Sequence, residues 1–284
     1  MVGLELLDGV QVRADVVADG GVRAGAGLHG ADAGVRQHPR APQEVGVLGP
    51  LTCAPPLTLR QVRSEARDRC ELRLVGTAAG PLAGDDLSLS LRLRAGARAQ
   101  RRATGASLAQ GRGHRGTAAL SIRAELADGA DLVADPGPLV VCAGSRVQVR
   151  LELMLGARAA VEWHELIVLG RAGEPAGQAT VRWDVTRAGR PVLRQIVDLT
   201  QPGALAGRRV LASALIADPV LAARTLVASP TAVAQRVDEH TLLVSVLADD
   251  AADAARQLAS LRAAAQAMKT AGGRPAADLP WCAC

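Results

Sequence analysis

The sequence predicts a mainly β protein of stacked or wrapped sheets that ends in an amphipathic helix. Runs of alternating apolar and polar residues recur along the middle of the chain, and this period of two is typical of half-buried strands. Similar glycine-containing corners end these runs. Near the C-terminus the apolar residues instead recur at spacings of three and four, which is the pattern of one helical face.

Composition limits both the core and the function. Of the 284 residues 49% are hydrophobic, yet only 1% are aromatic and none is Phe or Tyr, so the core is expected to consist of Leu, Val, Ala and Ile. The net charge of +5 comes from arginines spread through the alternating runs, with Lys269 as the single lysine. Aromatic residues that could stack on bases are missing between these arginines, which argues against a nucleic-acid partner.

Cysteine usage and hydropathy indicate a cytoplasmic protein without a membrane partner. The five cysteines are scattered and odd in number, which does not indicate a disulfide framework. No apolar stretch approaches the roughly 18 residues that a membrane helix needs.

The chain is expected to divide at about residue 55. Residues 1 to about 42 are rich in Gly, Ala, Val and Arg and show no sustained period, so residues 1–55 are predicted to be an extension, either flexible or translated from a start codon placed too early. Residues 56–284 are expected to form one β-rich domain. Its first strands are predicted at Leu57–Arg60 and Cys70–Val75, and a Gly/Pro-rich loop, Gly76–Asp86, follows them.

Alternating strands then follow one another. They are predicted at Leu87–Leu93, Leu120–Leu126, Val147–Leu155 and, around the turn Arg187–Arg190, Val181–Leu199. Corner glycines resemble those of tight hairpins, so the strands are expected to pair antiparallel. The separations of Gly96, Gly129 and Gly156 are 33 and 27 residues, which is not a strict solenoid repeat.

The last third becomes helical. Pro219–Leu226 is predicted to be a short helix and Thr241–Leu247 a buried strand. A helix is predicted near residues 249–270, because Asp249 and Asp250 suit its N-terminus and Lys269 suits its last turn.

The sequence contains no catalytic signature, so candidate sites rest on single polar residues. His164 and Glu165 are adjacent, and in a strand their side chains would point to opposite faces, which argues against a dyad. A buried Glu165 needs a partner, for which Arg171 is the natural candidate; such a pair could equally be a structural ion pair.

Two other groups keep two interpretations each, and a third has one. Asp85–Asp86 could coordinate a cation or simply open a strand. Cys282 and Cys284 could bind a soft metal or lie in a frayed terminus. Cys142 is interpreted as a small core residue.

Six motifs occur in the order in which they occur in the UreD (UreH) family of urease accessory proteins, and from residue 56 onward the chain resembles that family. The motifs are Gly80–Asp85, Arg102–Ser107, Asp135–Val140, Trp163–Glu165 with Leu169–Arg171, Gly189–Arg194 and Leu279–Trp281. The chain departs from the usual pattern at Pro81, Gly105 and Gly137, as a divergent member from a GC-rich bacterium would.

This resemblance implies a fold, partners and a site. The family fold is an elongated, β-helix-like stack of mixed sheets flanked by two helices. Family members are not enzymes; they are cytoplasmic chaperones that bind apo-urease with UreF and UreG and help to insert nickel. No tightly bound cofactor is expected, only transiently bound nickel. By position, Asp85, Thr104 and Glu165 would line an ion conduit, and Gly84, Gly170 and Arg171 would support it.

A second hypothesis treats the chain as a structural or interaction β-protein with no metal role. It predicts that replacing Glu165 costs stability but no activity. An enzyme remains a third alternative, which would require a pocket that combines Glu165 with a second titratable group.

Overall fold

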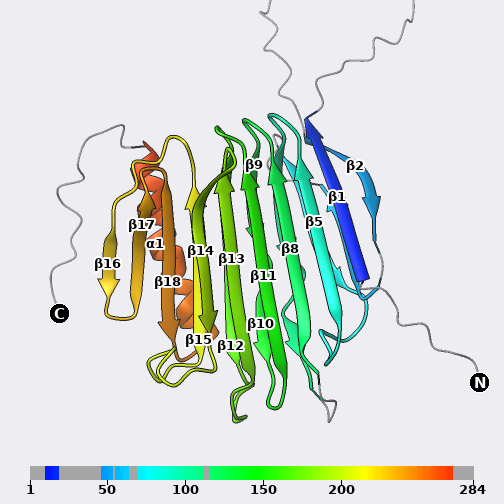
Figure 1. Cartoon of the computed structure of the whole chain (residues 1–284), viewed down its shortest axis with the longest axis vertical. Coiled ribbons are helices and arrows are strands. Elements are labelled where there is room, and N and C mark those ends of the chain that lie inside the picture. Colours follow the sequence, from blue (N-terminus) through cyan, green and yellow to red (C-terminus); the bar gives the residue numbers. More distant parts are fainter. Residues whose placement is uncertain (1–9, 19–45, 54, 64–68, 112–115, 271–284) are drawn as a thin grey trace, which may run out of the picture.

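A computed structural model describes residues 10–18, 46–53, 55–63, 69–111 and 116–270. Two facing β-sheets form an elongated stack, and one helix, α1 (Ala251–Thr270), lies against the outer side of the second sheet (Figure 1). The predicted mainly β, β-helix-like architecture is confirmed.

The first sheet has seven strands in the order β14-β13-β11-β8-β5-β1-β2. Their bounds are β1 (Val10–Ala18), β2 (Gly46–Thr52), β5 (Asp86–Leu93), β8 (Ala118–Leu126), β11 (Arg146–Leu155), β13 (Gln178–Arg187) and β14 (Arg190–Asp198). The five inner strands are parallel, and the edge strands β2 and β14 pair antiparallel to their neighbours. Strands β1 and β2 lie within residues 1–55, the segment expected to be an extension.

The second sheet has eleven strands, nine of them in the order β16-β17-β18-β15-β12-β9-β6-β4-β3, while β10 pairs with β12 and β7. Their bounds are β3 (Leu57–Val62), β4 (Cys70–Gly76), β6 (Arg98–Ala103), β7 (Ser107–Ala109), β9 (Asp131–Asp135), β10 (Pro138–Val141), β12 (Ala160–Leu169), β15 (Val210–Ala217), β16 (Leu226–Ser229), β17 (Ala232–Asp238) and β18 (Thr241–Ala248). Strands β4, β6, β9 and β12 are parallel, and from β12 through β15 to β16 the pairing is antiparallel.

The expected antiparallel succession is therefore wrong for the middle of the chain. At Gly96, Gly129 and Gly156 the chain does not fold back beside itself but crosses from the first sheet to the second. Successive corners stack, since a Cβ built on Gly129 would lie 3.6 Å from the backbone nitrogen of Gly96. The chain thus winds through the first sheet and then the second in each turn. Each long strand pairs with the corresponding strand of the next turn, and the separation of the corner glycines is the number of residues in one turn.

One helix is present among the described residues, so the expectation of two flanking helices is wrong there. Helix α1 matches the prediction: the side chain of Asp250 accepts a hydrogen bond from the backbone N–H of Asp253 at 2.8 Å, and Lys269 lies in the last turn. The predicted helix at Pro219–Leu226 forms only a turn, because the carbonyl and carboxylate of Asp218 accept the N–H groups of residues 221 and 220.

Two apolar clusters fill the protein. The larger lies between the two sheets and consists mainly of Leu, Val and Ala. The smaller lies between the outer face of β15, β17 and β18 and helix α1. Strand β15 contributes to both clusters, which explains why all its residues are buried. In the part of the chain that the structure describes, no helix has both the length and the apolar character needed to cross a membrane.

Candidate functional site

A hydrogen bond between Glu165 and Trp183 joins the two sheets in the interior. Glu165 lies on β12 and Trp183 on β13, and the indole Nε1 donates to the Glu165 carboxylate at 3.1 Å. Glu165 is 8% exposed. Burial raises its pKa to about 7, and the hydrogen bond from Trp183 opposes this rise. Glu165 can therefore gain or lose its proton near neutral pH.

This raised pKa predicts a pH-dependent stability difference between the wild type and Glu165→Gln. The folded state holds the proton more tightly than the unfolded state, whose pKa is near 4.5, so wild-type stability falls as the pH rises from about 4.5 to 7. The variant has no such loss. Urea unfolding is expected to give similar stabilities at pH 5 and an advantage of up to about 3 kcal/mol for the variant at pH 8. A difference that does not change with pH would contradict this account.

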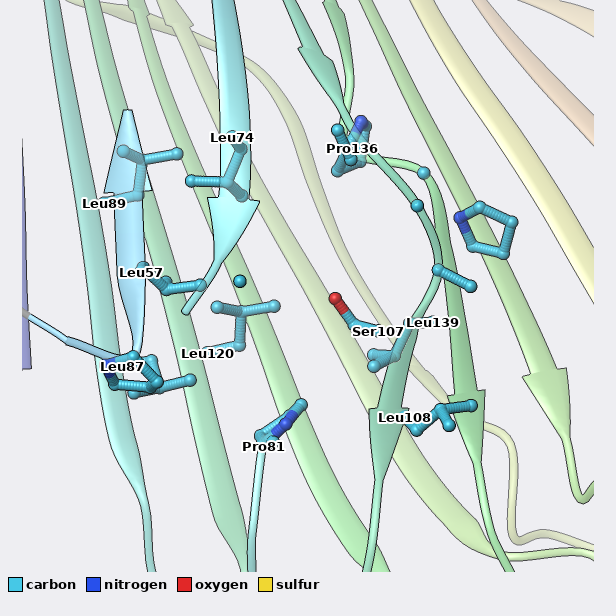
Figure 2. Close-up of a pocket in the computed structure, with 18 of the residues that line it drawn as sticks. Leu57, Leu74, Pro81, Leu87, Leu89, Ser107, Leu108, Leu120, Pro136 and Leu139 are labelled. Carbon is cyan, nitrogen blue, oxygen red and sulfur yellow. The ribbon is translucent and has the colours of Figure 1, made fainter. Parts of the chain in front are cut away.

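A cavity of about 320 Å³ lies between the sheets (Figure 2). Glu165 is one of its lining residues. Its walls are mostly aliphatic, and its polar lining residues are Arg101, Thr104, Ser107, Gln110 and Glu165. The exposed segment 104–106 also lines the cavity, which therefore reaches the protein surface.

Segments that are far apart in the sequence meet at this cavity. Residues Gly80 and Pro81 line it from one loop. Residues 104–106 line it from the connection of β6 to β7, and 136–137 from the connection of β9 to β10. The last two connections touch, because a Cβ built on Gly137 would lie 2.9 Å from the carbonyl oxygen of Gly105. With a φ of 74° as well, position 137 favours glycine.

A second cavity, of about 390 Å³, lies between the same connections and helix α1. From the helix it is lined by Ala255, Leu258, Ala259 and Arg262. Thr104 and Glu165 line both cavities. The structure thus brings together two of the three residues expected along a conduit, in the wall that the two cavities share.

Asp85, the third of these residues, lies elsewhere and closes its own loop. Its carboxylate accepts a hydrogen bond from the backbone N–H of Leu82 at 2.8 Å. Gly84 has a φ of 89°, and a Cβ built on Gly116 would lie 3.0 Å from its nitrogen. Asp85 and Gly84 therefore shape the loop that carries Gly80 and Pro81 to the cavity.

The expected pair of Glu165 and Arg171 is wrong. Arg171 binds Glu174, three residues along the same exposed turn, whereas Glu165 is held by Trp183. The Gly170 turn is fixed instead by Arg209, whose guanidinium donates to the carbonyl oxygen of Leu169 at 2.9 Å and also contacts that of Glu174. A Cβ on Gly170 would lie 2.5 Å from Arg209 Nη2, so this contact needs glycine.

A polar cluster between β12 and α1 was not predicted from the sequence. The buried Glu162 carboxylate accepts hydrogen bonds from His164 at 2.9 Å, from Gln266 at 2.9 Å and from Arg262. Burial disfavours the charged form of Glu162, but the hydrogen bond from His164 and the charge of Arg262 outweigh it and lower the pKa to about 2. The side chains of His164 and Glu165 thus point to opposite faces of β12, as predicted. Two sequence patterns could have indicated this cluster. Glu162 and His164 are two residues apart in a strand and therefore share a face, and Arg262 and Gln266 are four residues apart in a helix and are therefore neighbours.

Two of the described cysteines, Cys70 and Cys142, are buried. Cys70 is buried, and burial raises its pKa to about 11, so the thiol stays protonated. Cys142 is 5% exposed and lies in the core, as predicted. Within the described ranges no group of three or more His, Cys, Asp or Glu side chains is arranged to hold a metal ion. Cys282 and Cys284 lie outside the described residues.

Comparison with known proteins gives one consistent result. The sequence model of the UreD urease accessory protein family matches residues 32–281. A protein named urease accessory protein UreD from Frankia alni is 35% identical, over 78% of this chain and 89% of that protein. The UreD of Parafrankia sp. strain EAN1pec is 34% identical over 67% of this chain and 74% of its own length. A UreD 1 from Saccharopolyspora erythraea is 36% identical over 59% of this chain and 69% of its own length.

The family match covers helix α1 and every strand of the two sheets except β1, and it includes the segments that line the two cavities. The chain therefore belongs to the UreD family of urease accessory proteins.

Proposed function

We propose that this chain binds apo-urease together with UreF-like and UreG-like proteins in the cytoplasm and delivers nickel to the urease active site. Membership of an accessory family supports a role in urease maturation rather than in catalysis. In this proposal nickel is cargo that passes through the protein, and no cofactor stays bound.

The observation that carries the proposal is the shared wall of the two cavities. Thr104 and Glu165 are lining residues of both spaces, so in the proposed route an ion passes beside these two residues as it moves from one cavity to the other. A route needs weak ligands, because an ion that is held too tightly cannot leave. Two scattered oxygen ligands satisfy this requirement better than a closed cage of thiolates.

The pKa of Glu165 also suits such a route. At about 7 it allows the group to bind an ion as a carboxylate and to take up a proton when the ion leaves. Trp183 holds one carboxylate oxygen by its indole N–H, which fixes the side chain without neutralising it. In this proposal Asp85 and Gly84 shape the loop beside the first cavity, and Gly170 and Arg171 form the turn after β12.

The test compares urease activity in cells that carry the urease genes with and without this chain, at saturating nickel. We expect activity to fall in cells lacking the chain and to return when the gene is supplied again. Tagged chain is expected to retain the UreF-like and UreG-like proteins and apo-urease on an affinity column. Equal urease activity in the two strains would contradict the proposal and favour a metal-independent interaction protein.

A further inference from the structure

Arg101 is a charged side chain buried between the two sheets. It lies on β6 in register with Ala134 of β9, which is in turn in register with Trp163 of β12. Because Ala134 is small, the arginine side chain reaches across it, and its guanidinium carbon lies 5.9 Å from the centroid of the Trp163 ring. The residue is 1% exposed.

The charge of Arg101 is poorly compensated. Among the described residues, neither Nε nor Nη1 of this guanidinium has a hydrogen-bond partner. Burial lowers the pKa of Arg101 to about 10, opposed by the charge of Asp135, so the group remains protonated at neutral pH. The charge of Asp135 balances that of Arg101 only in part, and the cation–π contact with Trp163 offsets only part of the cost of burying a charge. Arg101 is therefore suited to bind an anion.

The cavity that Arg101 lines restricts the kind of anion. Most of its walls are aliphatic and come from both sheets; these residues are Leu57, Leu74, Leu87, Leu89, Leu120, Ile122, Leu139 and Val149 (Figure 2). A single guanidinium balances one negative charge, so a doubly charged phosphate or sulfate would remain uncompensated in these surroundings. Apolar walls around one polar anchor are typical of sites for ligands with an apolar body and one polar end.

Volume sets the length of such a ligand. A cavity of about 150 Å³ in another protein holds benzene, and the cavity of about 320 Å³ here is roughly twice as large. It therefore accommodates about a dozen non-hydrogen atoms.

We propose that this cavity binds an aliphatic monocarboxylate of about eight to ten carbons, with its carboxylate at Arg101 and its chain between the leucines of the two sheets. This site goes beyond urease maturation, and its test does not involve nickel, urease or the partner proteins.

The experiment titrates octanoate into the purified full-length chain by calorimetry, at concentrations below those that form micelles. We expect saturable binding to one site, with affinity rising about fourfold per added methylene from butyrate to octanoate. Octylamine, which has the same chain and the opposite charge, is expected not to bind. Equal affinity for butyrate and octanoate, or equal binding of octylamine, would overturn the proposal.

Two variants separate the role of Arg101 from general apolar binding. Arg101→Met is expected to weaken octanoate binding by about 10- to 100-fold, because it removes the charged donor and keeps a similar volume. Arg102→Met is the matched control: it is the next residue on the same strand, its side chain is exposed, and it does not line this cavity. Octanoate affinity that is unchanged in Arg101→Met would overturn the proposal. If Arg101→Met does not fold, the titrations of the wild type with the chain-length series and with octylamine still test the proposal.

Discussion

Replacing Glu165 with glutamine is expected to lower urease activity by about tenfold or more in cells grown at limiting nickel. Among the described residues that line the first cavity, Glu165 is the one carboxylate. Glutamine keeps the shape and can still accept the hydrogen bond from Trp183, so the variant removes little besides the negative charge. A dication that passes the shared wall would then lose its charged ligand.

This loss can be separated from a folding defect. Glu165→Gln is expected to be at least as stable as the wild type at neutral pH, because it no longer ionises a buried carboxyl. It should also co-purify with its partners at the wild-type level. Glu174→Gln is the control, since it removes a carboxylate from the turn with Arg171, away from both cavities. If the two variants support the same urease activity, Glu165 is not a ligand on the route.

Replacing Arg262 with methionine is expected to lower the free energy of unfolding by about 3 kcal/mol at pH 7. Glu162 is 5% exposed, and removal of Arg262 leaves its carboxylate with fewer partners in a low-dielectric site. This cluster joins α1 to β12, so the loss should be largest for the helix. Urea unfolding followed by circular dichroism measures the change.

The matched control for Arg262 is Arg256, on the same helix. Arg256 forms an exposed pair with Asp253, and such pairs contribute about 0.5 kcal/mol, so Arg256→Met should change the stability little. The contribution of the Glu162 cluster also depends on pH. Because the folded pKa of Glu162 is about 2, below the unfolded 4.5, this stability is present above pH 4.5 and is lost as the pH falls towards 2. Equal stability of the two variants at pH 7 would contradict this role.

Much of the fold could be predicted because it depends on local periodicity. Alternation from Leu87 to Leu93 identified β5, and the spacing of three and four with a preceding Asp250 identified α1. Strand direction could not be predicted in this way. Alternation is the same in parallel and antiparallel strands, and a glycine with positive φ, such as Gly129, suits both a hairpin and a crossing between sheets.

The candidate site was predicted only in part, for a similar reason. Alternation correctly separated His164 from Glu165, but each of their partners lies on another element. Trp183 in the first sheet donates a hydrogen bond to Glu165 in the second sheet. The predicted partner Arg171 instead forms an ion pair with Glu174, three residues along the chain. Glu162 and Arg262 are 100 residues apart, and only the docking of α1 on β12 brings them together.

The nickel content of urease tests whether this chain delivers the metal through the route beside Glu165. Urease would be purified from cells that make the wild-type chain, the Glu165→Gln variant or no chain, at equal levels of apo-urease and limiting nickel. The proposed route predicts nickel-loaded urease with the wild-type chain and strongly reduced nickel in the other two preparations. Equal nickel in all three would show that urease acquires the metal without this protein, and would contradict the account.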